Sequence, residues 1–319
     1  MERDSLLQGV GERQARWILP RGAVTVVAMS QGATITNLAD LIAPMPVEQF
    51  RALLAARDMH HATGAAGDRY AGLLDWDELL DGVRGTIPPK DIRLLRNRTK
   101  VPRFYLRNAG DERAEVVDRM LAADASVMLN HAERHVASLE RLCATVAEEV
   151  GDHVSAVVIA TAGAGGAFPI HYDPYDLLVL QVDGSKRWVL YGEPVDNPVQ
   201  GMPSLPAGAP ATPVMEVDLG AGDWLLLPAG QRHRCDTLSA RSLHIALLIY
   251  PLTAVRAVEL MLNDMLASPD DRAPMRFGPD GAAEAEEALK QRLMARIAAL
   301  SIDDLGRLHR STSAQRYEP

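Results

Sequence analysis

At the centre of the chain stands Phe168-Pro-Ile-His-Tyr-Asp-Pro-Tyr-Asp-Leu-Leu-Val-Leu-Gln-Val-Asp-Gly-Ser-Lys-Arg-Trp188. This stretch opens with a His-x-Asp pair, His171 and Asp173, and continues as an apolar run typical of a buried strand. Residues two apart in a strand point to the same face, so both side chains can aim into one barrel mouth. Further along, Gly222-Asp-Trp-Leu-Leu-Leu-Pro-Ala-Gly-Gln-Arg-His233 ends on a third candidate ligand. The three side chains together predict a metal site.

Two histidines and one carboxylate on one face suit Fe(II), because the opposite positions stay open to small ligands. Zinc uses similar ligands, so these residues alone leave open which metal binds and whether there is turnover. Lys186 separates the alternatives, because it lies fifteen residues after His171 at the start of the next predicted strand. Inside the same cavity it can pair with the carboxylate of a cosubstrate. Its other interpretation is an exposed turn lysine.

The formal net charge of -9 argues against a general nucleic-acid binder, so no stable nucleic-acid binding is expected. One local exception is the run from Lys90 to Arg107, whose only acid is Asp91. Such a run is either a solvated face or a surface for an acidic or RNA-rich partner.

Cys143 and Cys235 form no Cys-x-x-Cys motif, so neither a disulfide framework nor a thiolate zinc site is expected. Cys143 follows a helical pattern and is expected to be buried. The first residues lack the form of a signal peptide, and no apolar run approaches the ~20 residues of a membrane span. We therefore expect a cytoplasmic protein.

The pattern of the chain changes from helical to strand-like near residue 151. We expect an N-terminal extension over 1–37, a helical flank over 38–150, a β core over 151–252 and a C-terminal helical region over 253–319. The extension contains a short predicted strand at 23–28. Predicted core strands lie at 154–161, 176–182, 187–191, 215–219, 224–227 and 242–250, with Asp183-Gly184 as a hairpin turn. Predicted C-terminal helices lie at 254–267, 282–300 and 303–309.

The two central motifs resemble the core of JmjC-type, cupin-like Fe(II)/2-oxoglutarate oxygenases, and within them the ribosomal-oxygenase branch. Weaker similarity reaches upstream to Tyr70-Ala-Gly-Leu-Leu-Asp-Trp-Asp-Glu-Leu and Asp124-Ala-Ser-Val-Met-Leu-Asn-His. The resemblance implies a mainly β core, a double-stranded β-helix of the cupin/JmjC type, with a helical N-terminal flank and C-terminal helices. It also implies Fe(II), 2-oxoglutarate as cosubstrate, and O2.

By motif position, the resemblance implies that His171, Asp173 and His233 hold the iron. It implies that Lys186 binds the far carboxylate of 2-oxoglutarate and that Thr161 lies near the cosubstrate. His244, on the last core strand, either faces the cavity or is a core histidine. Candidate substrate walls are Tyr172, Tyr175 and the segments 163–168 and 194–213.

Two departures from the family pattern bear on the substrate. The family often has Asn and Tyr on the strand before His-x-Asp, where this chain has Val157 and Ile159. Cosubstrate contacts from those positions are therefore absent or replaced. The segment after Tyr250 is too short for the family's full winged-helix domain, and its helices are expected to serve in dimerisation.

The sequence thus predicts a homodimeric Fe(II)- and 2-oxoglutarate-dependent hydroxylase that acts on an amino-acid side chain of a protein or peptide and releases succinate. One alternative keeps the chemistry but takes a free amino acid or natural-product intermediate as substrate. Another is a non-oxidative cupin, an isomerase or a binding module, which needs no carboxylate clamp at Lys186.

Four further histidines are expected to lie outside the metal site. His60 and His61 follow a predicted helix, and adjacent residues at a helix end point apart. His131 and His135 lie four apart on a predicted helix, where we interpret them as surface or interface residues.

Overall fold

The computed structural model describes residues 35–63, 66–202, 211–274 and 282–311. Most of the predicted N-terminal extension, including the expected strand at 23–28, lies outside these residues, as does part of the predicted substrate loop at 194–213. No helix of the described residues is long and apolar enough to cross a membrane.

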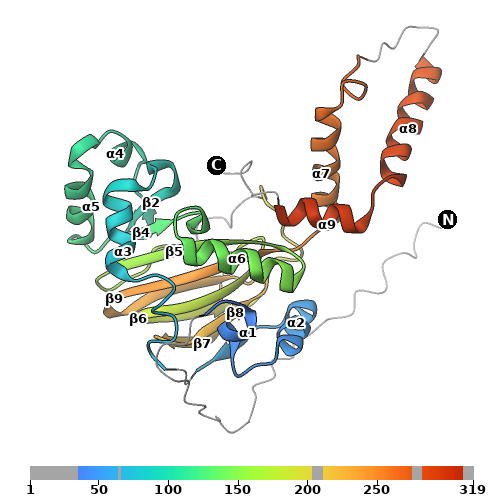
Figure 1. Ribbon diagram of the computed structural model, residues 1–319. Helices are drawn as coiled ribbons and strands as arrows, with labels where there is room; N and C mark the ends of the chain where they lie inside the picture. The colour runs from blue at the N-terminus through green and yellow to red at the C-terminus, as the bar shows by residue number, and fades with distance from the viewer. Residues whose placement is uncertain (1–34, 64–65, 203–210, 275–281, 312–319) are drawn as a thin grey trace, which may run out of the picture.

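The described residues form one antiparallel sheet with helices around it (Figure 1). Its strands follow the spatial order β1-β8-β6-β9-β5-β4-β2-β3, with β7 paired to β6. The bounds are β1 (His60–Ala62), β2 (Ile92–Arg96), β3 (Thr99–Lys100), β4 (Ser126–Leu129), β5 (His153–Ala162), β6 (Asp176–Tyr191), β7 (Pro213–Gly220), β8 (Trp224–Leu227) and β9 (His233–Tyr250).

Strands β6 and β9 roll the sheet into a barrel. Each is long, and its two halves have different neighbours. The first half of β6 pairs with the second half of β9 and with β8, and the second half pairs with the start of β9 and with β7. Side chains alternate between the faces of this sheet. On β5, Val157 and Ile159 belong to the inner cluster, whereas Ala156 and Val158 belong to the outer one. The predicted mainly β core with helical flanks is confirmed.

The predicted hairpin turn at Asp183-Gly184 is wrong. The chain continues through these residues as the single strand β6, with register shifts between Gln181 and Asp183 and between Gly184 and Lys186. Gly184 has φ +66°, and a Cβ there would lie 2.0 Å from Arg241 O. An Asp-Gly pair supports a bulge as well as a turn, since both need a residue with positive φ. Strand β9 is also longer than the predicted strand 242–250, because it pairs with the unbroken strand β6 from His233 onward.

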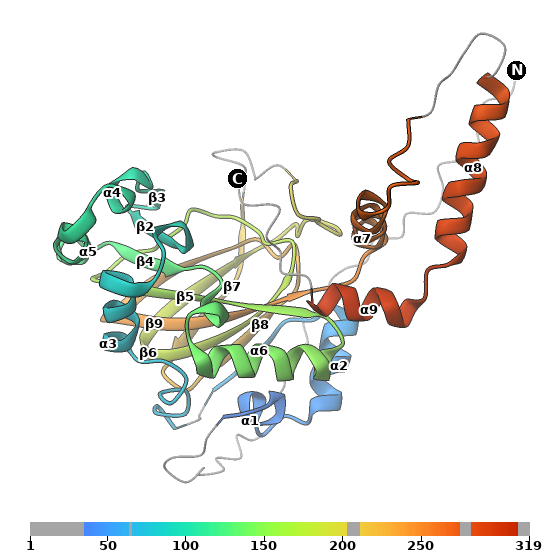
Figure 2. The ribbon, with the colours of Figure 1, turned by 45° about the horizontal axis from the view of Figure 1, so that its top comes forward.

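The N-terminal flank contains more β structure than its pattern predicts. Strands β1 to β4 are short and join the sheet at its edges, so the sheet begins well before residue 151. The helices between them are α1 (Leu38–Ile42), α2 (Val47–Ala56), α3 (Trp76–Asp81), α4 (Phe104–Arg107), α5 (Arg113–Leu121) and α6 (Ala137–Val150). Helix α6 lies across the outer face of the sheet and buries Leu139, Leu142 and Cys143, which confirms the burial of Cys143 (Figure 2).

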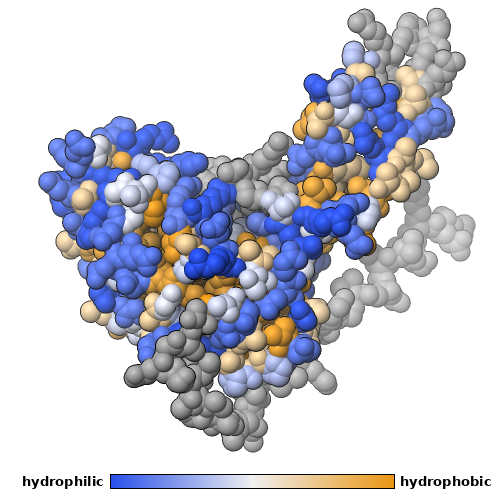
Figure 3. All heavy atoms as spheres, in the orientation of Figure 1, coloured by the Kyte–Doolittle hydropathy of each residue, from blue (hydrophilic) through white to orange (hydrophobic). Residues whose placement is uncertain are grey.

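The C-terminal helices are α7 (Ala254–Ala267), α8 (Ala282–Ala298) and α9 (Ile302–Ser311). Helices α7 and α8 project away from the barrel, whereas α9 returns to its end and contacts β5 (Figures 1 and 2). Apolar side chains remain exposed on the projecting pair (Figure 3). They include Val255, Val258, Leu262 and Leu266 on α7, and Met294 and Ile297 on α8.

The expected environments of two histidine pairs are corrected. His131 and His135 flank a short 3-10 turn (Ala132–Arg134) rather than lying on one helix. His135 Nε2 lies 2.9 Å from Asp91 Oδ2, and His131 Nδ1 lies 3.5 Å from Glu133 Oε1, so both imidazoles support the interior contacts of the flank. His60 and His61 lie on strand β1, where adjacent side chains also point apart.

A candidate metal centre inside the barrel

The structure brings His171, Asp173 and His233 together. His171 and His233 form an isolated antiparallel bridge, with His171 N donating to His233 O over 3.0 Å and His233 N donating back over 2.8 Å. One ligand atom from each of the three residues lies within 4.8 Å of the others. Asp173 Oδ2 is 3.6 Å from His233 Nε2 and 4.0 Å from His171 Nε2. The side chains thus converge on one point at the start of β9.

Backbone carbonyls fix the tautomers of both imidazoles. Nδ1 of His171 lies 2.9 Å from Pro169 O, and Nδ1 of His233 lies 2.9 Å from Gln231 O. A carbonyl only accepts, so each Nδ1 donates and each Nε2 keeps its lone pair for a metal. The donor set therefore fits a metal cation: two imidazole nitrogens with available lone pairs and one carboxylate oxygen, all on one side.

Aromatic side chains hold the two imidazoles in place. The Phe168 ring lies 5.4 Å from His171, and the Trp188 ring lies 5.5 Å from His233. Burial, assisted by the neighbouring His171, lowers the pKa of His233 to about 4. His233 is therefore neutral at physiological pH, which is the form that binds a metal.

Tyr175 supports the carboxylate of the site. Its hydroxyl donates a side-chain hydrogen bond to Asp173, and its ring packs 4.8 Å from Tyr250. Burial, and then the adjacent Asp173, hold the pKa of Tyr175 well above its usual value. Tyr172, between the two ligands in sequence, is half-buried.

Lys186 lies on the inner face of β6 and is 0% exposed. Its Nζ donates to Thr161 Oγ1 over 3.1 Å, and that oxygen also shares a 2.9 Å hydrogen bond with Ser126 Oγ. Among the described residues, Lys186 forms no ion pair with a carboxylate. Burial lowers the pKa of the Lys186 ammonium. A buried cation of this kind is costly unless an anion accompanies it.

Other polar atoms near Lys186 also lack a partner within the described part of the chain. They are His244 Nδ1, Trp188 Nε1 and Thr237 Oγ1. The rings of Trp188 and His244 are 5.9 Å apart, and burial followed by Lys186 places the pKa of His244 well below its usual value. Buried donors without partners mark a place for a polar ligand. The arrangement fits an anionic cosubstrate between Lys186 and the three converging side chains.

The register of β6 and β9 relates Lys186 to the candidate ligands. Leu190 pairs with His233 and Lys186 pairs with Thr237, so Lys186 lies four residues along the strands from the position of His233. At about 3.3 Å per residue this is roughly 13 Å along the backbone. The long Lys186 side chain and a short dicarboxylate together can span this separation. Val157 and Ile159, both buried, contribute an apolar wall from β5.

Arg98 ties the segment before the His-x-Asp pair to the rest of the molecule. It lies in the turn between β2 and β3, donates from Nη1 to Phe168 O over 2.7 Å and forms an ion pair with Asp236. Gly166 passes so close that a Cβ there would lie 2.4 Å from Cys235 O and 2.7 Å from Arg98 Nη1. Thr237 N also donates to Gly165 O over 2.7 Å. The segment 163–168 is thus held against β9 beside the candidate metal centre.

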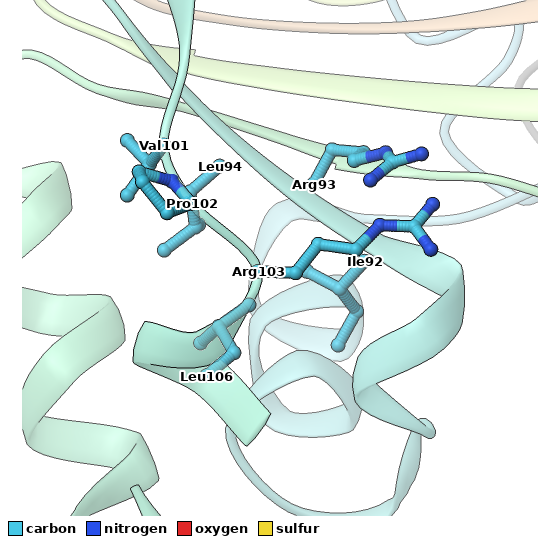
Figure 4. A pocket seen from close by; sticks show the side chains of 7 residues that line it. All are labelled: Ile92, Arg93, Leu94, Val101, Pro102, Arg103 and Leu106. Carbon is cyan, nitrogen blue, oxygen red and sulfur yellow. The ribbon is translucent and has the colours of Figure 1, made fainter. Parts of the chain in front are cut away.

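Ser126, Trp188 and Arg98 are contributors that sequence reasoning missed. Ser126 is a polar residue within an otherwise apolar strand, and this pattern could have indicated a role in the site. Trp188 and Arg98 reach the site only through pairings that are distant in sequence. A small surface pocket lies elsewhere, between β2 and α4, and is lined by Ile92, Arg93, Leu94, Val101, Pro102, Arg103 and Leu106 (Figure 4).

Comparison with known proteins finds a family that is similar to the barrel. The JmjC domain family matches residues 129–256, a span that includes both central motifs. The bifunctional lysine-specific demethylase and histidyl-hydroxylase NO66 of Drosophila persimilis is 32% identical over 126 residues, which cover 39% of this chain and 18% of the relative. Ribosomal oxygenase 1 of Danio rerio is 30% identical over 129 residues, which cover 39% of this chain and 24% of the relative.

Among solved structures, the Escherichia coli ribosomal oxygenase YcfD is similar in fold, with a TM-score of 0.52 and 16% identity. The similarity covers 76% of this chain and 64% of that one. This chain spans about a fifth to a quarter of the length of the two curated relatives. The resemblance noted from the motifs is confirmed, since residues 129–256 of this chain match the JmjC domain family.

Proposed function

We propose that the protein is an Fe(II)- and 2-oxoglutarate-dependent hydroxylase that acts on an amino-acid side chain of a protein or peptide. The observation that carries this proposal is Lys186, a fully buried cation without a carboxylate partner among the described residues. It shares the interior of a JmjC domain with three converging metal-binding side chains. A zinc-binding module or an isomerase has no need for such a buried cation. The name of the NO66 relative, a histidyl-hydroxylase, supports a protein side chain as substrate.

In this proposal His171, Asp173 and His233 hold the iron, and Lys186 binds the far carboxylate of 2-oxoglutarate. When bound, the metal and cosubstrate supply the oxidising chemistry that places one oxygen atom of O2 on a C–H carbon and the other in succinate, with release of CO2. The protein supplies orientation. Thr161 and Ser126 direct the Lys186 ammonium, and His244 and Trp188 offer further polar contacts beside it.

Exclusion of water is the second contribution of the chain. Val157 and Ile159 make the β5 side of the site apolar, where relatives often have Asn and Tyr. The buried Lys186 ammonium interacts strongly with a carboxylate because bulk water does not screen the pair. We place the substrate beside the three converging side chains, against Tyr172 and the segment 163–168, while Tyr175 orients Asp173.

We further propose a cytoplasmic homodimer. Both cysteines are free and buried, which agrees with a reducing compartment. Val255, Val258, Leu262 and Leu266 form one stripe on α7, at spacings that place them on the same helix face. Each is more than half exposed, and a second copy of the projecting helices would cover the stripe.

Turnover of 2-oxoglutarate with added Fe(II) tests the function. We expect succinate formation by the wild-type protein and none above background from His171→Ala. Because some oxygenases need substrate to start turnover, binding is measured separately, with Co(II) and the inert analogue N-oxalylglycine. Analogue binding that persists unchanged in Lys186→Ala would overturn the proposal. A mass-spectrometric search for products 16 Da heavier in treated cell extract then distinguishes protein from small-molecule substrates.

A further inference from the structure

The corner of the molecule formed by β2, β3 and α4 carries cations that lack acidic partners. Arg93, Arg96, Lys100 and Arg107 form no ion pair with any carboxylate of the described residues. Several arginines elsewhere do pair with acids, as Arg84 does with Asp118 at 2.7 Å. Arg96 only donates from Nε to Ala123 O over 3.0 Å, which leaves its terminal nitrogens available. In a chain of net charge -9, this corner is a local concentration of uncompensated positive charge.

Two aromatic rings lie exposed within the same corner. Phe104 and Tyr105 open helix α4 and are 53% and 47% exposed. Their rings stack on each other, with centroids 4.4 Å apart and an interplanar angle of 25°. A stacked pair presents flat outer ring surfaces to solvent. The chain has only four phenylalanines, and the other described ones are at least half-buried, so the exposure of Phe104 calls for a partner.

A small pocket lies beside these rings. Val101, Pro102 and Leu106 give it apolar walls, and the side chains of Arg93 and Arg103 extend along one side of it (Figure 4). With a volume of about 10 Å³ the pocket holds no more than a water molecule, so the cations and the exposed rings are what a ligand would contact.

The corner is connected to the candidate metal centre. Arg98, in the turn between β2 and β3, donates to Phe168 O and pairs with Asp236. Phe168 packs against His171. A macromolecule bound along the corner would therefore lie next to the segment that precedes the His-x-Asp pair.

We propose that this basic, aromatic corner binds single-stranded RNA. Phosphates attract the four cations, and unpaired bases stack on exposed aromatic rings, which is how single-stranded RNA is commonly bound. An acidic peptide would satisfy the cations but leave the ring surfaces of Phe104 and Tyr105 uncovered. The negative charge of the remaining chain repels phosphate, so the contact is confined to the corner and sensitive to salt. This inference does not depend on the proposed catalysis.

Fluorescence anisotropy of the full chain with a labelled, unstructured RNA of about 12 nucleotides tests the proposal. We expect Phe104→Ala/Tyr105→Ala to weaken binding roughly 5- to 100-fold without changing the salt dependence. Lys100→Glu and Arg107→Glu should each weaken binding and reduce the slope of log K against log salt by about 1 or more. Lys290→Glu, on exposed helix α8, makes the same charge change away from the corner and should have little effect.

Competition distinguishes the partner classes. Unlabelled RNA should displace the probe at far lower concentration than poly-glutamate of matched charge or the same sequence as DNA. Equal competition by poly-glutamate would overturn RNA in favour of an acidic peptide, and equal competition by DNA would overturn the preference for RNA. Unchanged affinity in the double aromatic variant would overturn the site itself. Co(II) binding by each variant verifies that the barrel remains folded.

Discussion

Lys186 Nζ donates a 3.1 Å hydrogen bond to Thr161 Oγ1 in the interior of the barrel, and no carboxylate of the described residues forms an ion pair with the ammonium. The buried ammonium therefore lowers the stability of the ligand-free protein, and we attribute its presence to cosubstrate binding. We predict that Lys186→Met raises the free energy of unfolding of the ligand-free protein by the order of 1 kcal/mol, because it removes a buried charge. The same variant should lose binding of N-oxalylglycine.

Denaturant unfolding and calorimetric titration together check this prediction. Stability and analogue binding should move in opposite directions in Lys186→Met. A structural lysine would instead give a variant that is less stable and still binds the analogue. That result would contradict the assignment of Lys186 to the cosubstrate.

Thr161 is predicted to act through Lys186. Thr161→Val keeps the shape of the side chain but removes the acceptor of Lys186 and the partner of Ser126, so it should cost about 1–3 kcal/mol of unfolding free energy. In the Lys186→Met background the cost should be clearly smaller, because the cation no longer needs the acceptor. Thr145→Val, at a partly exposed position of α6, is the control and should stay within about 0.5 kcal/mol. Additive effects in the double variant would contradict the coupling.

The sequence predicted the convergence of His171, Asp173 and His233 well and the strand boundaries less well. His171, Asp173 and Lys186 belong to one short stretch, and His233 follows a clear strand and turn, so local patterns were sufficient. The hairpin at Asp183-Gly184 failed because a positive φ is compatible with both a turn and a bulge, and only the pairing of β6 with β9 decides between them. Ser126 and Arg98 were missed because their partners, Thr161 and Phe168, are distant in sequence.

Arg98 is predicted to position the segment that precedes the candidate metal-binding pair, His171 and Asp173. Arg98→Gln removes the ion pair with Asp236 and weakens the hydrogen bond to Phe168 O, so hydrogen exchange should accelerate across 163–171. The affinity for Co(II) should fall by about tenfold, as it does when outer partners of metal ligands are removed. Arg96→Gln is the control, because Arg96 lies nearby but contacts Ala123 instead. Unchanged hydrogen exchange across 163–171 in Arg98→Gln would contradict the positioning role of Arg98.

Dimerisation through α7 is predicted to depend on its exposed stripe. Leu262→Asp places a charge at the centre of the stripe and should convert a dimer to a monomer in size-exclusion chromatography with light scattering. Leu238→Asp is the comparison, because Leu238 is similarly exposed but lies on β9. A wild-type protein that is monomeric at micromolar concentration, or a Leu262→Asp variant that remains dimeric, would contradict this role of α7.

The docking of helix α9 on the barrel is predicted to weaken in acid. His309 Nε2 donates to Tyr250 O over 2.6 Å, and His153 Nδ1 donates to Arg310 O over 3.0 Å. Burial lowers the pKa of both imidazoles below the ordinary value of about 6.5, and the remaining nitrogen of each has no partner within the described residues. The neutral forms are therefore the folded forms.

The sign of this effect follows from proton binding. Below about pH 6.5 the unfolded chain binds protons that the folded imidazoles resist, so the stabilisation is complete above that pH and is lost as the pH falls toward the folded pKa values. Asp152, 3.8 Å from His309, has a pKa raised by burial and contributes in the opposite direction, but only closer to its ordinary value near 4. Hydrogen exchange of residues 302–311 at pH 7.5 and pH 5.5 measures the docking. Protection factors, in which the slower intrinsic exchange at low pH is divided out, should fall at pH 5.5 in the wild type and fall less in His153→Asn/His309→Gln, whose side chains cannot take up the protons. An equal fall in that variant would show that other groups control the helix.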